Sequence, residues 1–101
     1  MTAMRAHHEW LPDTRIAVSR DQVSTTLSGE TIILQMRDGT YYGLDAVGTR
    51  IWSLIQEPAT LADISATVER EYDVDGARAM TDLITLVGEL FERGLIELRA
   101  A

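Results

Sequence analysis

The chain contains no cysteine, no lysine and only two prolines among its 101 residues. Without cysteine it has no disulfide and offers no thiolate to a metal or a substrate, which fits a reducing compartment. Long apolar runs are also absent. None approaches the roughly 20 residues of a transmembrane helix, and the N-terminus lacks the apolar segment of a signal peptide. These absences predict a cytoplasmic protein that is not inserted in a membrane.

Positive charge is scarce as well. Nine arginines stand against 16 acidic residues, which gives a net charge of −7 at pH 7. An acidic protein of this balance repels polyphosphate, so nucleic acid is a poor default partner. A basic or amphipathic peptide suits the chain better.

The composition describes one small globular domain. Hydrophobic residues make up 46% of the chain and charged residues 25%, and 101 residues leave no room for a second core. We expect residues 1–14 to form a mobile N-terminal segment and residues 15–101 to form the domain. His7, His8 and Glu9 do not predict a metal site, because adjacent side chains of an extended segment diverge and no further histidine exists.

Three strands are expected in the first half of the chain, at residues 23–27, 31–37 and 40–44. Ser28-Gly29 forms the first turn, and Asp38-Gly39 favours a tight two-residue hairpin turn between the second and third strands. A further short extended piece is expected at residues 15–19. Alternation at period two predicts one inner, apolar face of this sheet. Its members are Ile32, Leu34, Met36, Tyr42 and Leu44.

Three helices are expected to follow, over residues 46–56, 60–72 and 76–93. Asp45, Thr60 and Asp75 are their N-cap candidates. Pro58 separates the first two helices, and Gly94 ends the third as a left-handed C-terminal cap. Three strands followed by three helices predict an α+β fold, a winged-helix-like domain with a three-stranded antiparallel sheet.

The third helix carries a wide apolar face. At 100° per residue its apolar side chains span an arc of about 160°, from Leu86 at one edge to Ile84 at the other. A stripe that faces a core needs about 100° or a little more. One edge of the arc is therefore either exposed in the free protein or covered by the other helices, and periodicity leaves both possibilities open.

Two runs in the chain resemble the PqqD-like family of peptide-recognition proteins. They are Tyr-x-Leu-Asp-x-Val-Gly-x-x-Ile-Trp, from Tyr42 to Trp52, and Leu-x-x-x-Gly-Leu-Ile, from Leu90 to Ile96. The resemblance extends over about residues 16–98. Members of this family bind the leader segment of a ribosomally made precursor peptide and present it to modifying enzymes.

The resemblance implies a binding mode. A leader peptide adds as a further strand along residues 40–44, and its side chains enter the groove between that strand and the third helix. Gly43 then either lets a foreign backbone approach closely or bends the chain into the helix. Asp82 and Glu89 either meet basic peptide residues at the rim or are solvated surface charges. The implied peptide-binding residues are Thr40, Tyr41, Tyr42, Gly43, Leu44, Met80, Asp82, Leu83, Ile84 and Val87.

The implied function is a stand-alone, non-catalytic module without a cofactor. It delivers a precursor to a leader peptidase or other modifying enzyme, and it is most similar to the lasso-peptide members of the family. A carrier in pyrroloquinoline quinone biosynthesis is the alternative within the family. A winged-helix DNA-binding protein is the alternative of another class, although the third helix offers Arg78 beside Asp75 and Asp82 and lacks a basic stripe. The sequence contains no recognisable nucleophile–base pair and no glycine-rich phosphate loop.

Overall fold

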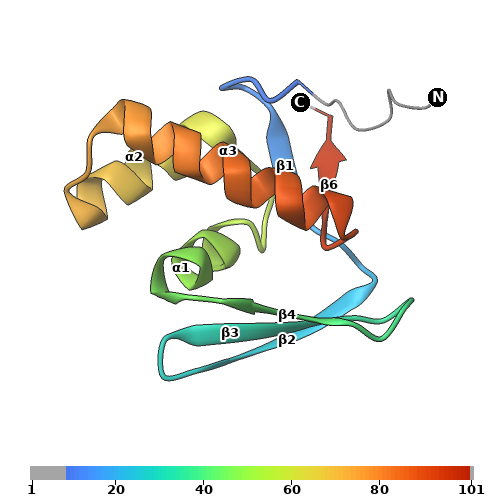
Figure 1. Cartoon of the computed structure of the whole chain (residues 1–101). Helices are drawn as coiled ribbons and strands as arrows, with labels where there is room; N and C mark the ends of the chain where they lie inside the picture. The colour runs from blue at the N-terminus through green and yellow to red at the C-terminus, as the bar shows by residue number, and fades with distance from the viewer. Residues whose placement is uncertain (1–8, 101) are drawn as a thin grey trace.

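The computed structural model describes residues 9–100. Its elements in chain order are β1 (Arg15–Val18), β2 (Gln22–Leu27), β3 (Glu30–Gln35), β4 (Tyr41–Leu44), α1 (Ala46–Leu54), β5 (Ala59–Thr60), α2 (Leu61–Tyr72), α3 (Gly76–Glu92) and β6 (Ile96–Arg99). They form two antiparallel sheets, β2-β3-β4 and β5-β1-β6, around the three helices (Figure 1). The predicted α+β class, the first sheet and the three helices are confirmed. The winged-helix likeness stays a prediction.

Local capping explains where the helices begin and end. Asp45, Thr60 and Asp75 each accept a hydrogen bond from the backbone N–H three residues on, at 2.9, 3.1 and 3.2 Å. Each bond satisfies a donor that the first helical turn would otherwise leave unpaired. At the end of α3, Gly94 has φ +74°, a conformation that glycine adopts without strain. The predicted caps are thus the caps of the structure.

The second sheet is absent from the predicted order of three strands followed by three helices. β1 pairs with β6 from Arg15–Arg99 to Val18–Ile96, and the two residues of β5 pair with the other edge of β1. Of this sheet, the sequence indicated only the extended piece at residues 15–19. Because these pairings join segments far apart in the chain, no local pattern signals them.

The predicted inner face of β3 is wrong by one residue. Thr31, Ile33 and Gln35 are the buried residues, at 1%, 0% and 2% exposure, whereas Ile32 and Met36 are 49% and 59% exposed on the outer face. A shift of one residue moves every side chain of a strand to the opposite face. Leu34 shares the outer face, since neighbours alternate. Of the predicted inner residues on β4, Leu44 is buried and Tyr42 is half-buried.

The buried polar side chains of β3 are satisfied by hydrogen bonds. The Gln35 Nε2 donates to the carbonyl oxygens of Arg93 and Gly94, at 3.1 and 3.0 Å, and its Oε1 accepts from the Arg37 N–H at 2.9 Å. The Thr31 hydroxyl shares a 2.8 Å hydrogen bond with the Thr26 hydroxyl. Satisfied polar groups cost little when buried, so β3 tolerates them on its inner face.

The β3–β4 connection is longer than the predicted two-residue turn. The Gln35 N–H donates to the Thr40 oxygen at 2.8 Å, and the Gly39 N–H donates to the Gln35 oxygen at 2.9 Å. Residues 36–39 therefore form the loop, with Gly39 at φ +73°. Asp38 and Gly39 do lie in the turn, but the loop is of the longer type built around a helical turn.

The core lies between the first sheet, the helices and β1 and β6. Figure 1 shows α1 between the first sheet and α3. Trp52 of α1 is buried against the sheet, and its Nε1 donates to the Ser24 hydroxyl of β2 at 3.1 Å. The largest fully buried side chains come from every layer and include Ile16, Ile33, Ile55, Leu61, Ile64, Leu83 and Leu90.

The described part of the predicted N-terminal segment packs on the domain. The Trp10 ring lies edge-on to the Phe91 ring of α3, with centroids 5.5 Å apart. The Pro12 and Thr14 oxygens accept hydrogen bonds from the first two N–H groups of α2, at 2.9 and 3.0 Å. His7 and the adjacent His8 lie outside the described residues. The division of the chain at residue 14 stays a prediction.

Candidate functional site

A groove of about 540 Å³ opens between β4 and the three helices. Aliphatic side chains dominate its lining, and polar groups occur mainly at its rim. Its residues come from β4 and the turn after it, α1, the C-terminal half of α2, the α2–α3 connection and one face of α3. They are Tyr42, Gly43, Leu44, Asp45, Val47, Gly48, Ile51, Val68, Tyr72, Val74, Ala79, Asp82, Leu83 and Leu86.

The strand beside the groove has an unpaired edge. Within residues 9–100, β4 pairs only with β3. The Gln35 N–H bonds to the Thr40 oxygen, and bonded pairs alternate along an antiparallel ladder. The backbone N–H and C=O groups of Tyr41 and Gly43 therefore point away from β3, toward the open edge. Gly43 pairs with Ile32, so a Cβ on Gly43 would point to the outer face of the sheet, where it would meet no atom within 4 Å.

Tyr42 connects the two walls at one end of the groove. Its hydroxyl donates to Glu89 Oε1 of α3 at 2.6 Å, and the Arg93 guanidinium lies 4.9 Å from the centre of its ring. Burial, and then the hydrogen bond to Glu89, raise the pKa of Tyr42, because both disfavour the phenolate. The tyrosine stays a neutral donor that holds β4 against α3.

Two features fix the α1 wall. The Arg50 Nε and Nη2 donate to the two carboxylate oxygens of Glu71, both at 2.9 Å, so α1 is joined to α2 by a bidentate ion pair. Gly48 faces the strand so closely that a Cβ on it would lie 3.2 Å from Leu44. The close approach of α1 and β4 places the floor of the groove directly behind the open edge.

The structure brings five predicted site residues into the groove and leaves five outside its lining. Tyr42, Gly43, Leu44, Asp82 and Leu83 line it. Thr40, in the loop before β4, bonds to Asp38, and the Tyr41 side chain is 69% exposed on the outer face of the sheet. Tyr41 therefore reaches the open edge through its backbone alone, whereas the Thr40 oxygen is bonded to Gln35 of β3.

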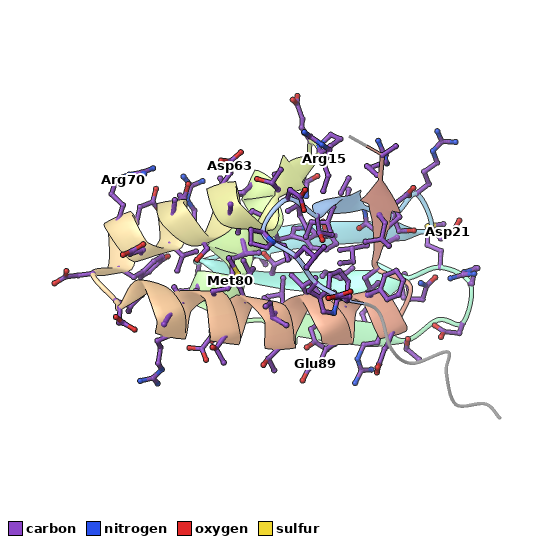
Figure 2. The ribbon with its side chains drawn as sticks, turned by 90° about the horizontal axis from the view of Figure 1, so that it is seen from above. Arg15, Asp21, Asp63, Arg70, Met80 and Glu89 are labelled. Carbon is purple, nitrogen blue, oxygen red and sulfur yellow. The ribbon has the colours of Figure 1, made fainter. Side chains whose placement is uncertain are left out.

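The predicted helix residues mostly lie on other sides of α3. Val87 is fully buried in the core, and Met80 and Ile84 are half-buried against it. Figure 2 shows Met80 on the side of α3 that faces α2, while Glu89 points to the opposite side. Of the predicted helix wall, only Leu83 lines this groove, and its α3 neighbours there are Ala79, Asp82 and Leu86.

A signal for this edge was present in the sequence. Asp82 and Glu89, expected at the groove rim, are four residues before and three residues after Leu86, and such spacings share one helix face. Ile84 belongs to the opposite edge of the apolar arc. If Asp82 and Glu89 lie at the groove rim, the apolar residue of α3 that lines the groove between them is Leu86. The lining residues Val68, Tyr72 and Val74 had no such signal, because only the tertiary packing brings them there.

Residues 9–100 hold no group of three or more His, Asp or Glu side chains placed to bind a metal ion. In the same part of the chain, the helices are too short or too polar to span a bilayer.

Comparison with known proteins identifies relatives of this fold and site. Residues 30–96 match the family described as “Coenzyme PQQ synthesis protein D (PqqD)”. A solved structure described as “TbiB1 in Complex with the TbiA(beta) Leader Peptide” is similar with a TM-score of 0.77 at 36% identity, covering 84% of this chain and 99% of that chain. A second, “Lasso peptide synthetase B1 complexed with the leader peptide”, has a TM-score of 0.73 at 22% identity, covering 81% and 96%. No curated protein matches.

At 22% identity, the second structure supports the fold alone. The first is 36% identical to this chain, and the match covers 99% of that structure's chain. The family match spans well over half of the chain and includes β3, β4 and all three helices. The open strand edge and the groove therefore lie within the matched region, and the chain belongs to the PqqD family.

Proposed function

We propose that this protein binds the leader segment of a ribosomally synthesised precursor peptide in lasso-peptide biosynthesis. The leader adds as a strand to the open edge of β4 and places alternate side chains in the groove. The protein then delivers the precursor to a leader peptidase or another modifying enzyme. We assign no catalytic step to the protein itself.

The observation that carries the proposal is the coincidence of an unpaired edge with an apolar groove. The N–H and C=O groups of Tyr41 and Gly43 offer hydrogen bonds that any extended peptide satisfies, whatever its side chains. Side chains of an added strand alternate between the two faces of the sheet. Those on the inner face enter the groove, where Leu44, Leu83 and Leu86 favour apolar residues.

The rim adds a preference for positive charge. Asp82 lines the groove and lies 3.5 Å from Arg78, while Glu89 accepts from Tyr42. Both carboxylates are exposed, so each contributes at most about 1 kcal/mol to a contact with a basic residue. Their effect is on association and register, and the apolar groove carries the affinity.

The relatives favour leader-peptide binding over DNA binding. The structure at 36% identity, which this chain matches over 99% of its length, is described as a complex with a leader peptide. The family match, described as “Coenzyme PQQ synthesis protein D (PqqD)”, leaves a carrier in pyrroloquinoline quinone biosynthesis as the alternative within the family. The DNA-binding alternative requires a basic helix face, whereas α3 carries Asp75 at its cap and Asp82 in its first turns.

Calorimetric titration with the TbiA(beta) leader peptide, and with leaders encoded beside this gene, tests the proposal. Leu86→Asp places a charge in the apolar wall, and we expect affinity to fall by at least about tenfold, or roughly 1.4 kcal/mol. Thr85→Asp is the matched control, because this substitution adds the same charge at an exposed position of α3. Equal affinities of the two variants, with both folded by circular dichroism, would place the peptide elsewhere.

A further inference from the structure

The opposite edge of the first sheet is also open. Within the described residues, β2 pairs only with β3, and five of its six residues are exposed. Its sequence, Gln-Val-Ser-Thr-Thr-Leu, contains no charged residue and no proline. Proteins normally protect a long edge strand with charges, proline or a covering element. The unprotected edge of β2 is therefore suited to pair with another strand.

The backbone groups available on this edge follow from the ladder with β3. The Met36 N–H donates to the Asp21 oxygen at 2.8 Å, just before β2 begins. Bonded pairs alternate along an antiparallel ladder, so the N–H and C=O groups of Gln22, Ser24 and Thr26 point away from β3. These three residues are the ones that an added strand must meet.

The β2 strand of a second protomer can pair antiparallel with these outward backbone groups. With Thr25 on a two-fold axis, Ser24 of each copy opposes Thr26 of the other, so the outward backbone groups of these two residues pair, while Gln22 lies opposite the turn residue Ser28. On the outer face the same register sets Val23 against Leu27 twice. These side chains are 52% and 73% exposed in the single chain. An axis at Ser24 pairs the outward backbone groups of all three residues but removes both apolar pairs. An axis at Thr26 removes the apolar pairs as well and leaves only Thr26 paired within the strand.

Charge also fits an antiparallel pair of copies. Each copy carries a net charge of −7, so two copies meet with least repulsion along an uncharged strand. Antiparallel pairing brings the Arg20 end of one β2 toward the hairpin that leads into Glu30 of the other. Asp21 at the same end is already 3.5 Å from Arg37 within its own chain. The unlike charges of Arg20 and Glu30 therefore approach at both ends of the pair.

We infer that the protein forms a two-fold dimer through β2. The two sheets then join into one six-stranded sheet of order β4-β3-β2-β2-β3-β4. Both β4 edges remain at its far ends, so the dimer presents two grooves and leaves each accessible. The inference rests on β2 alone and is independent of what the groove binds.

Single cysteines test the pairing, because the chain has none of its own. In this register, Thr25 faces its own copy in a non-bonded pair, with Cα atoms about 4.5 Å apart, a span that a disulfide bridges. Thr25→Cys should give a covalent dimer in glutathione redox buffer, whereas Thr85→Cys on exposed α3 should not. Val23→Cys should cross-link when mixed with Leu27→Cys but not alone. Equal cross-linking of Thr25→Cys and Thr85→Cys would overturn the inference.

Sedimentation equilibrium provides the second measurement. Thr25→Lys places two like charges across the axis. We expect the dissociation constant of the dimer to rise at least about tenfold, or roughly 1.4 kcal/mol. Thr85→Lys adds the same charge away from β2 and should leave the dimer unchanged. A wild-type protein that remains monomeric at high micromolar concentration would refute the dimer, as would equal behaviour of the two lysine variants.

Discussion

Two adjacent isoleucines of β3 test the packing that positions the groove. Ile33 is fully buried, whereas Ile32 is 49% exposed on the outer face. Alanine at either position removes the same atoms from the same strand, so the difference isolates burial. We expect Ile33→Ala to cost about 2–5 kcal/mol, because it leaves a cavity under α1. Ile32→Ala should cost about 1 kcal/mol, since only about half of a burial energy of roughly 1.5–3 kcal/mol is lost.

Urea unfolding followed by circular dichroism measures both free energies, provided that the slope with denaturant is unchanged. In thermal unfolding, each kcal/mol corresponds to a shift of about 4–8 °C for a domain of this size. Ile33→Ala should therefore lower the melting temperature by roughly 12–24 °C at a cost near 3 kcal/mol, and Ile32→Ala by roughly 4–8 °C. A larger loss for Ile32→Ala would show that the register of the sheet is displaced by one residue.

Two further substitutions test the residues around the groove. The raised pKa of Tyr42 means that its contribution to stability is complete below the ordinary tyrosine pKa of about 10 and is lost as the pH rises through the folded-state value. Unfolding free energy should therefore fall less steeply above pH ~10 in Tyr42→Phe than in the wild type, and parallel curves would contradict the Glu89 bond. Asp45→Ala should cost about 0.5–2 kcal/mol in urea unfolding, whereas Asp45→Asn should retain most of the cap; equal losses would contradict capping.

The helices could be predicted from the sequence because their signals are local. Asp45, Thr60 and Asp75 cap from within three residues of their targets, and Gly94 provides the left-handed turn that ends α3. Capping depends on chemistry and spacing along the chain, and both are visible before folding.

The face of β3 could not be predicted so well. The run Ile32–Ile33–Leu34 is apolar on both faces, so alternation alone does not select one. A buried glutamine such as Gln35 is costly unless its amide is hydrogen-bonded. Its cost is removed by carbonyl groups of Arg93 and Gly94, nearly 60 residues away in sequence. The second sheet was missed for the same physical reason, since β1 pairs with residues 59–60 and 96–99, both far from it along the chain.

The candidate site was half predictable. The resemblance named Tyr42, Gly43 and Leu44, which belong to its most specific motif, and all three line the groove. The residues of α3 that line the groove could not be predicted without knowing which side of the helix the other elements cover. α2 takes the side that carries Met80, which leaves the Leu86 side to form the groove.

The most direct test of the central claim is a backbone amide NMR titration of the ¹⁵N-labelled protein with precursor leader peptides encoded near its gene. Addition of a strand at β4 predicts the largest shifts at Tyr41 and Gly43, together with Ala79, Leu83 and Leu86 across the groove. It also predicts that the Tyr41 and Gly43 amides become protected from hydrogen exchange. Saturable binding whose shifts lie outside β4 and this face of α3 would contradict the account.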